Sequence, residues 1–312
     1  MSSACPAGRR PCVGVAVTPE LCRTTSRTRA HVSPSGVRLR PRLIVAIGAL
    51  ALVGLLLLIS TRHSGQQSVQ QGVTTTTQNA TESVPRLRAE VLARLPHDTS
   101  AFTQGLEIAD GVLYESTGLA GHSTMRALDP TTGLELRRVP LTPPLFGEGA
   151  TVVGDRIWQL TWQDGVAIQR DRTTLAEVGR SRYQGEGWGL CHDDKRLVMS
   201  DGTDRLTFRD PVTFAQVGEV RVTNAGQPLT RLNELECVGG AVWANVWQSN
   251  DIVRIDPGSG HVTAVADLTA LRPPDRSGDD VLNGIAAVPG TDEFLVTGKD
   301  WQTLYRVRFV PA

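Results

Sequence analysis

From residue 100 to the C-terminus, short apolar runs alternate with turn signals, and no stretch keeps a helical period for more than two turns. Asp110-Gly111, Gly154-Asp155 and Gly239-Gly240 are examples of these turn signals. Apolar runs of this length between such pairs are typical of β-strands. The pattern therefore predicts an all-β fold.

A repeat runs through this region. In each copy a polar motif leads into a short strand, and a tight turn then leads into a second strand. The first strands begin at 102–108 (F-T-Q-G-L-E-I), 146–152 (F-G-E-G-A-T-V), 185–191 (G-E-G-W-G-L-C), 232–238 (L-N-E-L-E-C-V) and 282–288 (L-N-G-I-A-A-V). The second strands are at 112–118, 156–162, 196–202, 241–247 and 294–300. Tandem units of about 40–50 residues indicate a β-propeller, so five copies predict five blades.

The two ends of the repeat region agree with this count. The last copy has a third strand at 304–309 but no fourth, whereas 89–95 (A-E-V-L-A-R-L) is strand-like and precedes the first copy. An N-terminal strand that completes the last blade would close the ring and cover an open edge. We therefore predict that residues 87–312 form a five-bladed β-propeller catalytic domain.

The region before this domain has a different pattern. Residues 43–59 are 17 consecutive apolar residues, and with Ser60 they predict a transmembrane signal anchor over 43–60. Arg38, Arg40 and Arg42 precede it, so the basic tail 1–42 is expected in the cytoplasm and the catalytic domain outside the cell membrane. The alternative is a cleaved signal peptide, which would make the domain secreted; the long basic stretch before the apolar run favours a retained anchor. Residues 61–86 are rich in Gln, Thr and Ser and predict a disordered linker.

Charge and cysteine content narrow the function classes. Lys+Arg and Asp+Glu both number 32, so the formal net charge is zero. This balance excludes a strongly basic nucleic-acid binder, and we expect no nucleic-acid partner and a monomeric chain. Five cysteines are too few for a disulfide scaffold.

The candidate functional residues lie at one end of the predicted ring. The residues just before the first strand and just after the second strand of each blade lie at the same end of the hairpin, so together they form one mouth. These residues are Phe102, Gln104, Phe146, Glu148, Glu186, Trp188, Asn233, Glu234, Asn283, Thr117, Trp162, Asp201, Trp247, Lys299 and Trp301. A glutamate between two glycines, such as Glu148, is by itself typical of a tight turn, and Trp158 and Trp243 are expected in the core. The coincidence of so many polar and aromatic residues at one mouth favours a functional site.

The motifs F-T-Q-G-L, G-E-G, L-T-W, G-E-G-W-G-L, S-D-G, L-N-E-L-E, A-N-V-W, I-D-P, L-N-G-I-A and T-G-K-D-W occur in this order. Over residues 88–309 the chain resembles the plant and bacterial glutaminyl-peptide cyclotransferases, the papaya latex enzyme family. The resemblance implies a five-bladed propeller that converts the N-terminal glutamine of peptides or proteins into pyroglutamate, releases ammonia and uses no catalytic zinc. Matched motif by motif, it implies catalytic roles for Glu148 and Lys299. It implies substrate-binding roles for Phe102, Gln104, Phe146, Trp162, Trp188, Asn233 and Trp247.

The reaction makes clear demands on these residues. The substrate's α-amine, with a usual pKa of ~7.7–8.0, attacks its own side-chain amide. One carboxylate, Glu148, takes the amine proton and returns it to the leaving nitrogen. Lys299, Gln104 and Asn233 are expected to hold the amide oxygen as it gains charge. Trp188 and Trp247 are expected to wall the pocket and attract the ammonium form.

Two other functions stay open at this point. One is an extracytoplasmic binding propeller that recognises a peptide or glycan. The other is a calcium-dependent lactonase-like propeller, against which the count of five repeats and the lysine in the site both argue. The six histidines are scattered, and the chain contains no C-x-x-C or H-E-x-x-H motif. We expect no cofactor, and a structural calcium ion in the central channel is left open.

Cys191 and Cys237 lie at matching positions of the third and fourth repeats. Neighbouring inner strands of a propeller converge, so a disulfide between them is geometrically feasible. Two buried thiols that never pair are the alternative, which the sequence slightly favours.

Overall fold

The computed structural model describes residues 83–274, 278 and 280–312. Within these residues the chain is built of β-strands, together with one short 3₁₀ helix, η1 (Thr269–Leu271). The prediction of an all-β fold is confirmed.

Three sheets hold four antiparallel strands each, paired in the order of the sequence. Tight turns at Gly and Asp join neighbouring strands, as short apolar runs with this punctuation require. The first sheet contains β2 (Thr103–Ala109), β3 (Val112–Thr117), β4 (Thr124–Leu128) and β5 (Glu135–Pro140). The second contains β6 (Gly147–Val153), β7 (Arg156–Thr161), β8 (Val166–Asp171) and β9 (Glu177–Arg182). The third contains β10 (Leu190–His192), β11 (Leu197–Ser200), β12 (Arg205–Arg209) and β13 (Gln216–Arg221).

The fourth sheet has eight strands, in the order β16-β17-β18-β19-β1-β22-β21-β20. Its strands are β16 (Leu232–Val238), β17 (Ala241–Val246), β18 (Asp251–Ile255), β19 (Val262–Asp267), β1 (Arg86–Pro96), β22 (Thr303–Pro311), β21 (Glu293–Gly298) and β20 (Leu282–Ala287). A small ribbon, β14 (Thr223–Asn224) with β15 (Gln227–Pro228), completes the set.

Strand β1 joins the two ends of the repeat region. It pairs antiparallel with β22 from Leu87 opposite Pro311 to Pro96 opposite Thr303, and Arg86–Arg88 also pair in parallel with β19. The predicted closing strand at 89–95 is therefore confirmed. It begins at Arg86, one residue before the predicted start of the domain.

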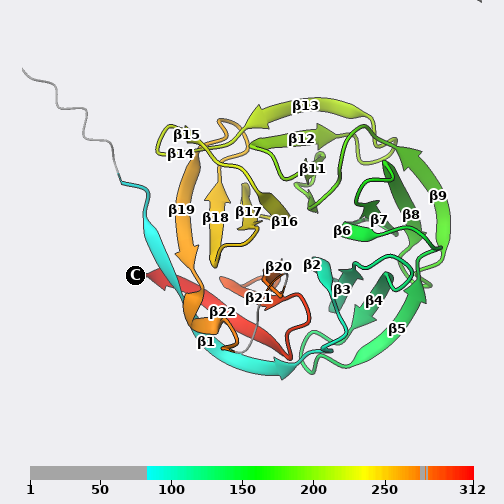
Figure 1. Cartoon of the computed structure of the whole chain (residues 1–312), viewed down its shortest axis with the longest axis horizontal. Helices are drawn as coiled ribbons and strands as arrows, with labels where there is room; N and C mark the ends of the chain where they lie inside the picture. Colours follow the sequence, from blue (N-terminus) through cyan, green and yellow to red (C-terminus); the bar gives the residue numbers. More distant parts are fainter. Residues whose placement is uncertain (1–82, 275–277, 279) are drawn as a thin grey trace, which may run out of the picture. The chain divides into compact units, whose positions relative to one another are not determined.

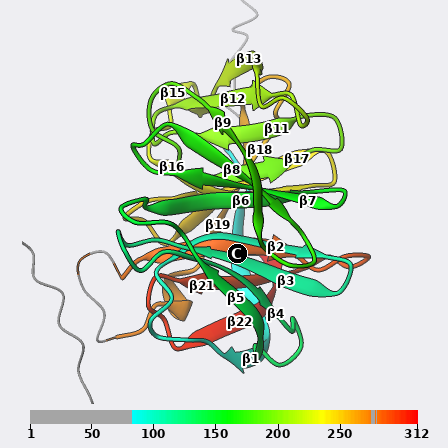
Figure 2. The same cartoon turned by 90° about the vertical axis from the view of Figure 1, so that its right-hand side faces the viewer.

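The sheets are arranged around a ring (Figure 1). Strands β2, β6, β16 and β20 lie nearest its centre, and β5, β9, β13 and β19 lie at the periphery. The strands nearer the centre are also more buried than those at the periphery. Five of the six residues of β7 are buried, whereas the residues of the peripheral strand β9 are exposed or half-buried. In the side view (Figure 2), β2 and β6 lie next to each other across the boundary of two sheets.

Apolar side chains fill the spaces between neighbouring sheets. Trp158 packs against Phe214 with ring centroids 4.9 Å apart. Within the eight-stranded sheet, Trp243 on β17 packs in the same way against Phe294 on β21, at 5.3 Å. Both tryptophans are buried, so the prediction that they belong to the core is confirmed.

Cys191 on β10 and Cys237 on β16 form a disulfide, with their Cα atoms 5.4 Å apart. The expectation that slightly favoured two unpaired thiols is therefore wrong. The two inner strands converge toward the centre of the ring and bring the Cα atoms within the ~4.4–6.8 Å that a disulfide requires.

The predicted basic tail (1–42), transmembrane anchor (43–60) and nearly all of the linker (61–86) lie outside the described residues. Among the residues that are described, no helix is both long enough and apolar enough to cross a membrane.

Candidate active site

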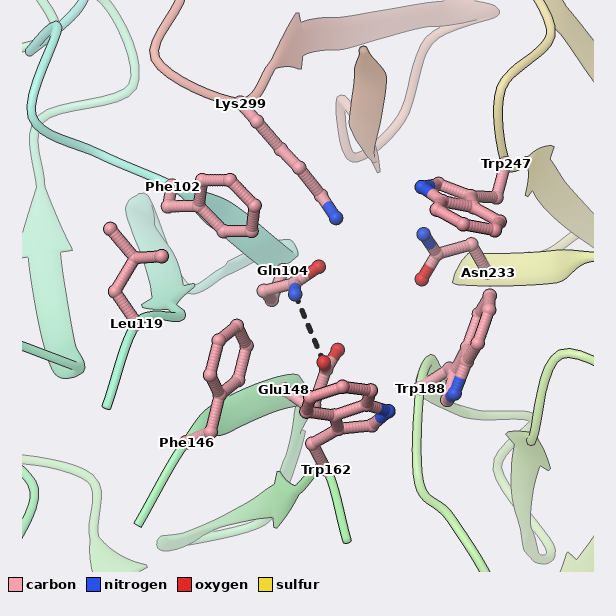
Figure 3. A pocket seen from close by; sticks show the side chains of 10 residues that line it. All are labelled: Phe102, Gln104, Leu119, Phe146, Glu148, Trp162, Trp188, Asn233, Trp247 and Lys299. Atoms are coloured by element: carbon pink, nitrogen blue, oxygen red, sulfur yellow. Dashed lines mark hydrogen bonds between the residues drawn. The ribbon is translucent and has the colours of Figure 1, made fainter. Parts of the chain in front are cut away.

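A pocket of about 290 Å³ opens at one end of the ring. All nine residues predicted as catalytic or substrate-binding line it, together with Leu119 (Figure 3). They come from the starts of the innermost strands or from the turns after the second strands, as in Gln104 on β2 and Trp162 directly after β7. The hairpin geometry assumed from the sequence therefore brings these side chains together, and their roles in catalysis stay predictions.

The pocket has a polar floor and an aromatic wall. The floor consists of four buried polar side chains, which are Gln104, Glu148, Asn233 and Lys299. The wall consists of Phe102, Phe146, Trp162, Trp188 and Trp247. Trp162 and Leu119 are the most open of the lining residues, with 36% and 41% exposure, and they mark the entrance.

Glu148 is the carboxylate of the floor, and Gln104 holds one of its oxygens. Gln104 Nε2 donates to Glu148 Oε1 at 2.9 Å, and Glu148 Oε2 is buried without a hydrogen-bond partner among the described residues. Burial raises the pKa of Glu148 well above its usual value; the nearby Lys299 lowers it in part, and Glu186 raises it further. A carboxylate held in this way binds a proton more readily than one in water.

The two glycines beside Glu148 serve the packing of the strands. A β-carbon on Gly147 would lie 2.6 Å from the carbonyl oxygen of Thr117, and one on Gly149 would lie 2.6 Å from the backbone nitrogen of Leu190. Only glycine lets β6 approach its neighbours this closely. These contacts set the depth at which Glu148 enters the pocket.

Asn283 orients Gln104, although it does not line the pocket. Its Nδ2 donates to Gln104 Oε1 at 3.1 Å and to the carbonyl oxygen of Thr103 at 2.9 Å. The amide oxygen of Gln104 is thereby occupied, so its NH₂ group faces Glu148. The sequence placed Asn283 at the mouth but did not distinguish it as a supporting residue, because its partner Gln104 is 179 residues away in the sequence.

Lys299 enters the pocket from the turn after β21. Its Nζ lies 4.5 Å from the centre of the Phe102 ring, a cation–π distance. Its backbone N–H donates to the carbonyl oxygen of Val281, and the next residue, Asp300, donates to Ala101. In Figure 3, Lys299, Gln104 and Glu148 point toward the middle of the pocket, and the aromatic side chains surround them.

The other mouth residues named from the sequence do not line the pocket; they are Thr117, Glu186, Asp201, Glu234, Asn283 and Trp301. Trp301 is buried in a core cluster, and its Nε1 donates to the carbonyl oxygen of Asp280. Glu234 is buried and accepts hydrogen bonds from the backbone N–H groups of Leu106 and Ile285. Glu186 instead supports the aromatic wall, because it accepts hydrogen bonds from Trp162 and Trp188.

Leu119 is the lining residue that sequence reasoning missed. It follows Gly118, whose own position is crowded by the rings of Phe102 and Phe146, and its φ is +79°. A left-handed leucine is a conformation that apolar patterning does not reveal. Within the described ranges, His, Cys, Asp and Glu side chains form no group of three arranged to hold a metal ion.

Comparisons with known proteins add independent findings. Residues 66–309 match the family model described as glutamine cyclotransferase. The chain is 39% identical over 229 residues to a glutaminyl-peptide cyclotransferase of Arabidopsis thaliana, which covers 72% of each chain. The structure is similar to the crystal structure of Myxococcus xanthus glutaminyl cyclase, with a TM-score of 0.69 and 40% identity. That match covers 73% of this chain and 99% of the Myxococcus chain.

Proposed function

The chain belongs to the glutamine cyclotransferase family and is a glutaminyl-peptide cyclotransferase, and we propose that Glu148 moves the proton in its reaction. The reaction converts the N-terminal glutamine of a peptide or protein into pyroglutamate and releases ammonia. One observation supports the assignment above all others. The buried Glu148 carboxylate lies on the pocket floor with Oε1 held by Gln104, which leaves Oε2 to receive a proton.

The proposed steps balance in atoms and charge. The neutral α-amine of the substrate attacks the δ-carbon of its own side-chain amide, and a new C–N bond closes a five-membered ring. Glu148 Oε2 takes one proton from the attacking nitrogen and delivers it to the amide nitrogen. The original C–N bond then breaks, ammonia leaves, and the carbonyl of pyroglutamate re-forms. The raised pKa of Glu148 suits the first transfer, because it makes the carboxylate a stronger base than one in water, and the proton that it takes up is then available to the leaving nitrogen.

Lys299 and Asn233 are the proposed partners of the amide oxygen. Both are buried on the floor beside Glu148, and Lys299 carries the positive charge that a developing oxyanion needs. Gln104 donates one N–H to Glu148, and its amide oxygen accepts from Asn283. Its proposed role is to hold the carboxylate, and its second N–H can donate to the amide oxygen of the substrate.

Ammonia release from a glutamine-initiated dipeptide tests the role of Glu148. We expect Glu148→Gln to lower kcat by about 100-fold or more, the usual range for loss of general acid–base catalysis. Glu177→Gln removes an exposed carboxylate on β9 and is the matched control, with kcat expected to stay at the wild-type value. A Glu148→Gln variant with wild-type kcat would reassign the proton transfer.

We also propose that the reaction needs no metal or other cofactor. The proposed steps use only the floor residues and the substrate's own amine. Turnover in the presence of a strong chelator tests this, and activity that is lost with the chelator and restored by one added metal ion would overturn it.

For the fold, we propose a five-bladed β-propeller in which the eight-stranded sheet counts as two blades. Each half of that sheet has four strands in the order of a blade, with β1 as the fourth strand of the half that contains β20, β21 and β22, and β1 also pairs briefly with β19 of the other half. The five repeats in the sequence support the same count. A crystal structure that showed a different number of sheets around the channel would contradict it.

We further propose that residues 43–59 anchor a monomeric chain in the cell membrane, with the catalytic domain outside the cytoplasm. The apolar run with its preceding arginines supports this proposal. Protease treatment of intact cells tests the orientation, because an external domain is degraded while the cell stays closed. Recovery of the whole chain in the soluble fraction, without cleavage near residue 60, would argue against the anchor.

A further inference from the structure

The aromatic wall of the pocket consists of two groups of rings. In one group, Phe102 contacts Phe146 at 6.1 Å between centroids, and Phe146 contacts Trp162 at 5.6 Å. In the other group, Trp188 contacts Trp247 edge to face at 5.6 Å. Phe102 also faces Lys299. The wall therefore has a junction between Trp162 and Trp188, where one group ends and the other begins.

Glu186 spans this junction with a single carboxylate oxygen. Its Oε2 accepts hydrogen bonds from Trp162 Nε1 and from Trp188 Nε1, each at 2.9 Å. Its Oε1 accepts a third hydrogen bond from Gln163 Nε2 at 2.9 Å. An indole has only one polar hydrogen, and it can only donate. Glu186 thus takes the one polar contact that each of these two tryptophans can make, and in Figure 3 both indole nitrogens face the space between the rings.

The backbone around Glu186 is locked to the strand that carries Glu148. Gly187 N–H donates to the carbonyl oxygen of Trp162 at 2.9 Å, and Gly149 N–H donates to the carbonyl oxygen of Trp188 at 2.7 Å. A β-carbon on Gly187 would collide with the hydroxyl of Tyr183, so the turn packs too closely against Tyr183 to hold any side chain at this position. The position of Glu186 is therefore set relative to both tryptophans and to the catalytic carboxylate.

We propose that Glu186 is a positioning residue of the reaction, which holds Trp162 and Trp188 as facing walls and places a fixed negative charge at the pocket mouth. This inference rests on the proposed role of the pocket as the cyclisation site. Glu186 is not itself proposed to touch the reacting atoms. It acts on them through the two indoles and through its charge.

The groups around Glu186 favour its negatively charged form. Partial burial opposes ionisation of Glu186, but hydrogen bonds from Trp188, Gln163 and Trp162 outweigh it and lower its pKa. Asp201 opposes this as a like charge and is itself paired with Arg205.

Glu148 in turn faces three titratable groups. They are Lys299, which lowers the pKa of Glu148, Glu186, which raises it, and the buried Tyr183, whose own pKa is raised by burial. Glu186 thus helps to keep Glu148 able to hold a proton.

Two substitutions separate the two effects. Glu186→Gln keeps an amide oxygen that can accept from the indoles but removes the charge. Because the like charge is gone, the pKa of Glu148 falls, and the acidic limb of the kcat–pH profile should move to lower pH by about half a unit. Glu186→Ala removes the hydrogen bonds as well, so we expect KM to rise about tenfold and kcat to fall up to about tenfold as the walls lose their alignment.

The experiment measures kcat and KM of the full chain on a glutamine-initiated dipeptide across pH, together with intrinsic tryptophan fluorescence. Emission should change in Glu186→Ala and stay close to wild type in Glu186→Gln, and Glu177→Gln should match the wild type in every readout. Glu186 variants with wild-type KM, pH profile and emission would overturn the inference. A wild-type chain that releases no ammonia would instead overturn the proposed function. In that case, a change in tryptophan emission in Glu186→Ala would nevertheless show that Glu186 connects the indoles of Trp162 and Trp188.

Discussion

Buried glutamates in this protein have opposite pKa shifts because their neighbours differ. Despite the opposing effect of burial, Glu115 has a lowered pKa, since His97 contacts it at 3.0 Å and Arg126 lies 3.5 Å away. Glu148 has a raised pKa, since burial exceeds the effect of Lys299. The surroundings of Glu115 favour its ionised form, which pairs with His97 and Arg126. The surroundings of Glu148 favour its protonated form, so this carboxylate takes up a proton more readily.

This contrast predicts opposite effects of two matched substitutions on folding stability. The folded-state pKa of Glu148 lies above its unfolded value, so its contribution to stability is full below the unfolded pKa and is lost as the pH rises through the folded value. Glu148→Gln should therefore raise Tm at pH 8 and have little effect at pH 5. A gain of about 1 kcal/mol corresponds to ~2–4 °C for a domain of this size.

Glu115→Gln is the matched comparison. The folded-state pKa of Glu115 is lowered, so its stabilising contribution is present above the unfolded pKa and is lost as the pH falls. At pH 8 this variant should lower Tm by several degrees, because it leaves the buried Arg126 without one of its partners. Thermal unfolding of both variants at pH 5 and 8 measures the difference, and shifts of the same sign would refute the assignment.

At the scale of elements, side chains connect innermost strands that do not pair with one another. Glu234 on β16 accepts from the backbone of Leu106 on β2 at 3.2 Å and of Ile285 on β20 at 2.8 Å. The disulfide between Cys191 and Cys237 joins β10 to β16 in the same way. These links hold together strands that share no ladder of backbone hydrogen bonds.

Removal of the disulfide should therefore weaken the contact between β10 and β16. Its two cysteines are 46 residues apart in the sequence, and a bridge over a loop of that length contributes roughly 2–4 kcal/mol to the free energy of unfolding. Chemical denaturation of a Cys191→Ala/Cys237→Ala variant should show this loss, with Cys22→Ser as control. With residues 1–82 deleted, only these two cysteines remain. Two titratable thiols in that denatured, unreduced chain would contradict the bridge.

At the scale of the whole molecule, β1 decides whether the ring is closed. It pairs with β22 along most of its length and meets β19 at its start, so it connects the last repeat to the one before it. Val84 and the carbonyl oxygen of Pro85 also contact this region. Without β1, the edges of β22 and β19 would be exposed for pairing with other chains.

We therefore expect two truncations to behave differently. Deletion of residues 1–82 should leave a soluble, monomeric and active protein, since all strands from β1 to β22 and all pocket residues remain. Deletion of residues 1–95 should give an unfolded or aggregated chain. Size-exclusion chromatography, thermal unfolding and ammonia release compare the two, and equal behaviour of both truncations would show that β1 does not close the ring.

Much of the site was predictable because the repeat gives each motif a fixed place relative to its strand pair. Phe102, Phe146 and Trp188 precede the innermost strands of their repeats, and in an antiparallel hairpin that start lies beside the end of the second strand. Trp162 and Trp247 occupy those ends. The alternation of apolar and polar residues, together with the turn residues, indicates which strands pair. Because pairing fixes where the ends of two strands lie, it also places the side chains beside those ends.

Local patterning repeated along the chain was enough to predict the all-β class, the closing strand and every pocket residue except Leu119. Which side chains touch depends instead on the tertiary structure. It buried Trp301 in the core, paired Cys191 with Cys237, turned Asn283 toward Gln104 and placed Glu186 between two indoles. These contacts join residues from different sheets or from the turns between them. Their geometry follows from how the sheets pack around the ring, which no pattern within a single strand records.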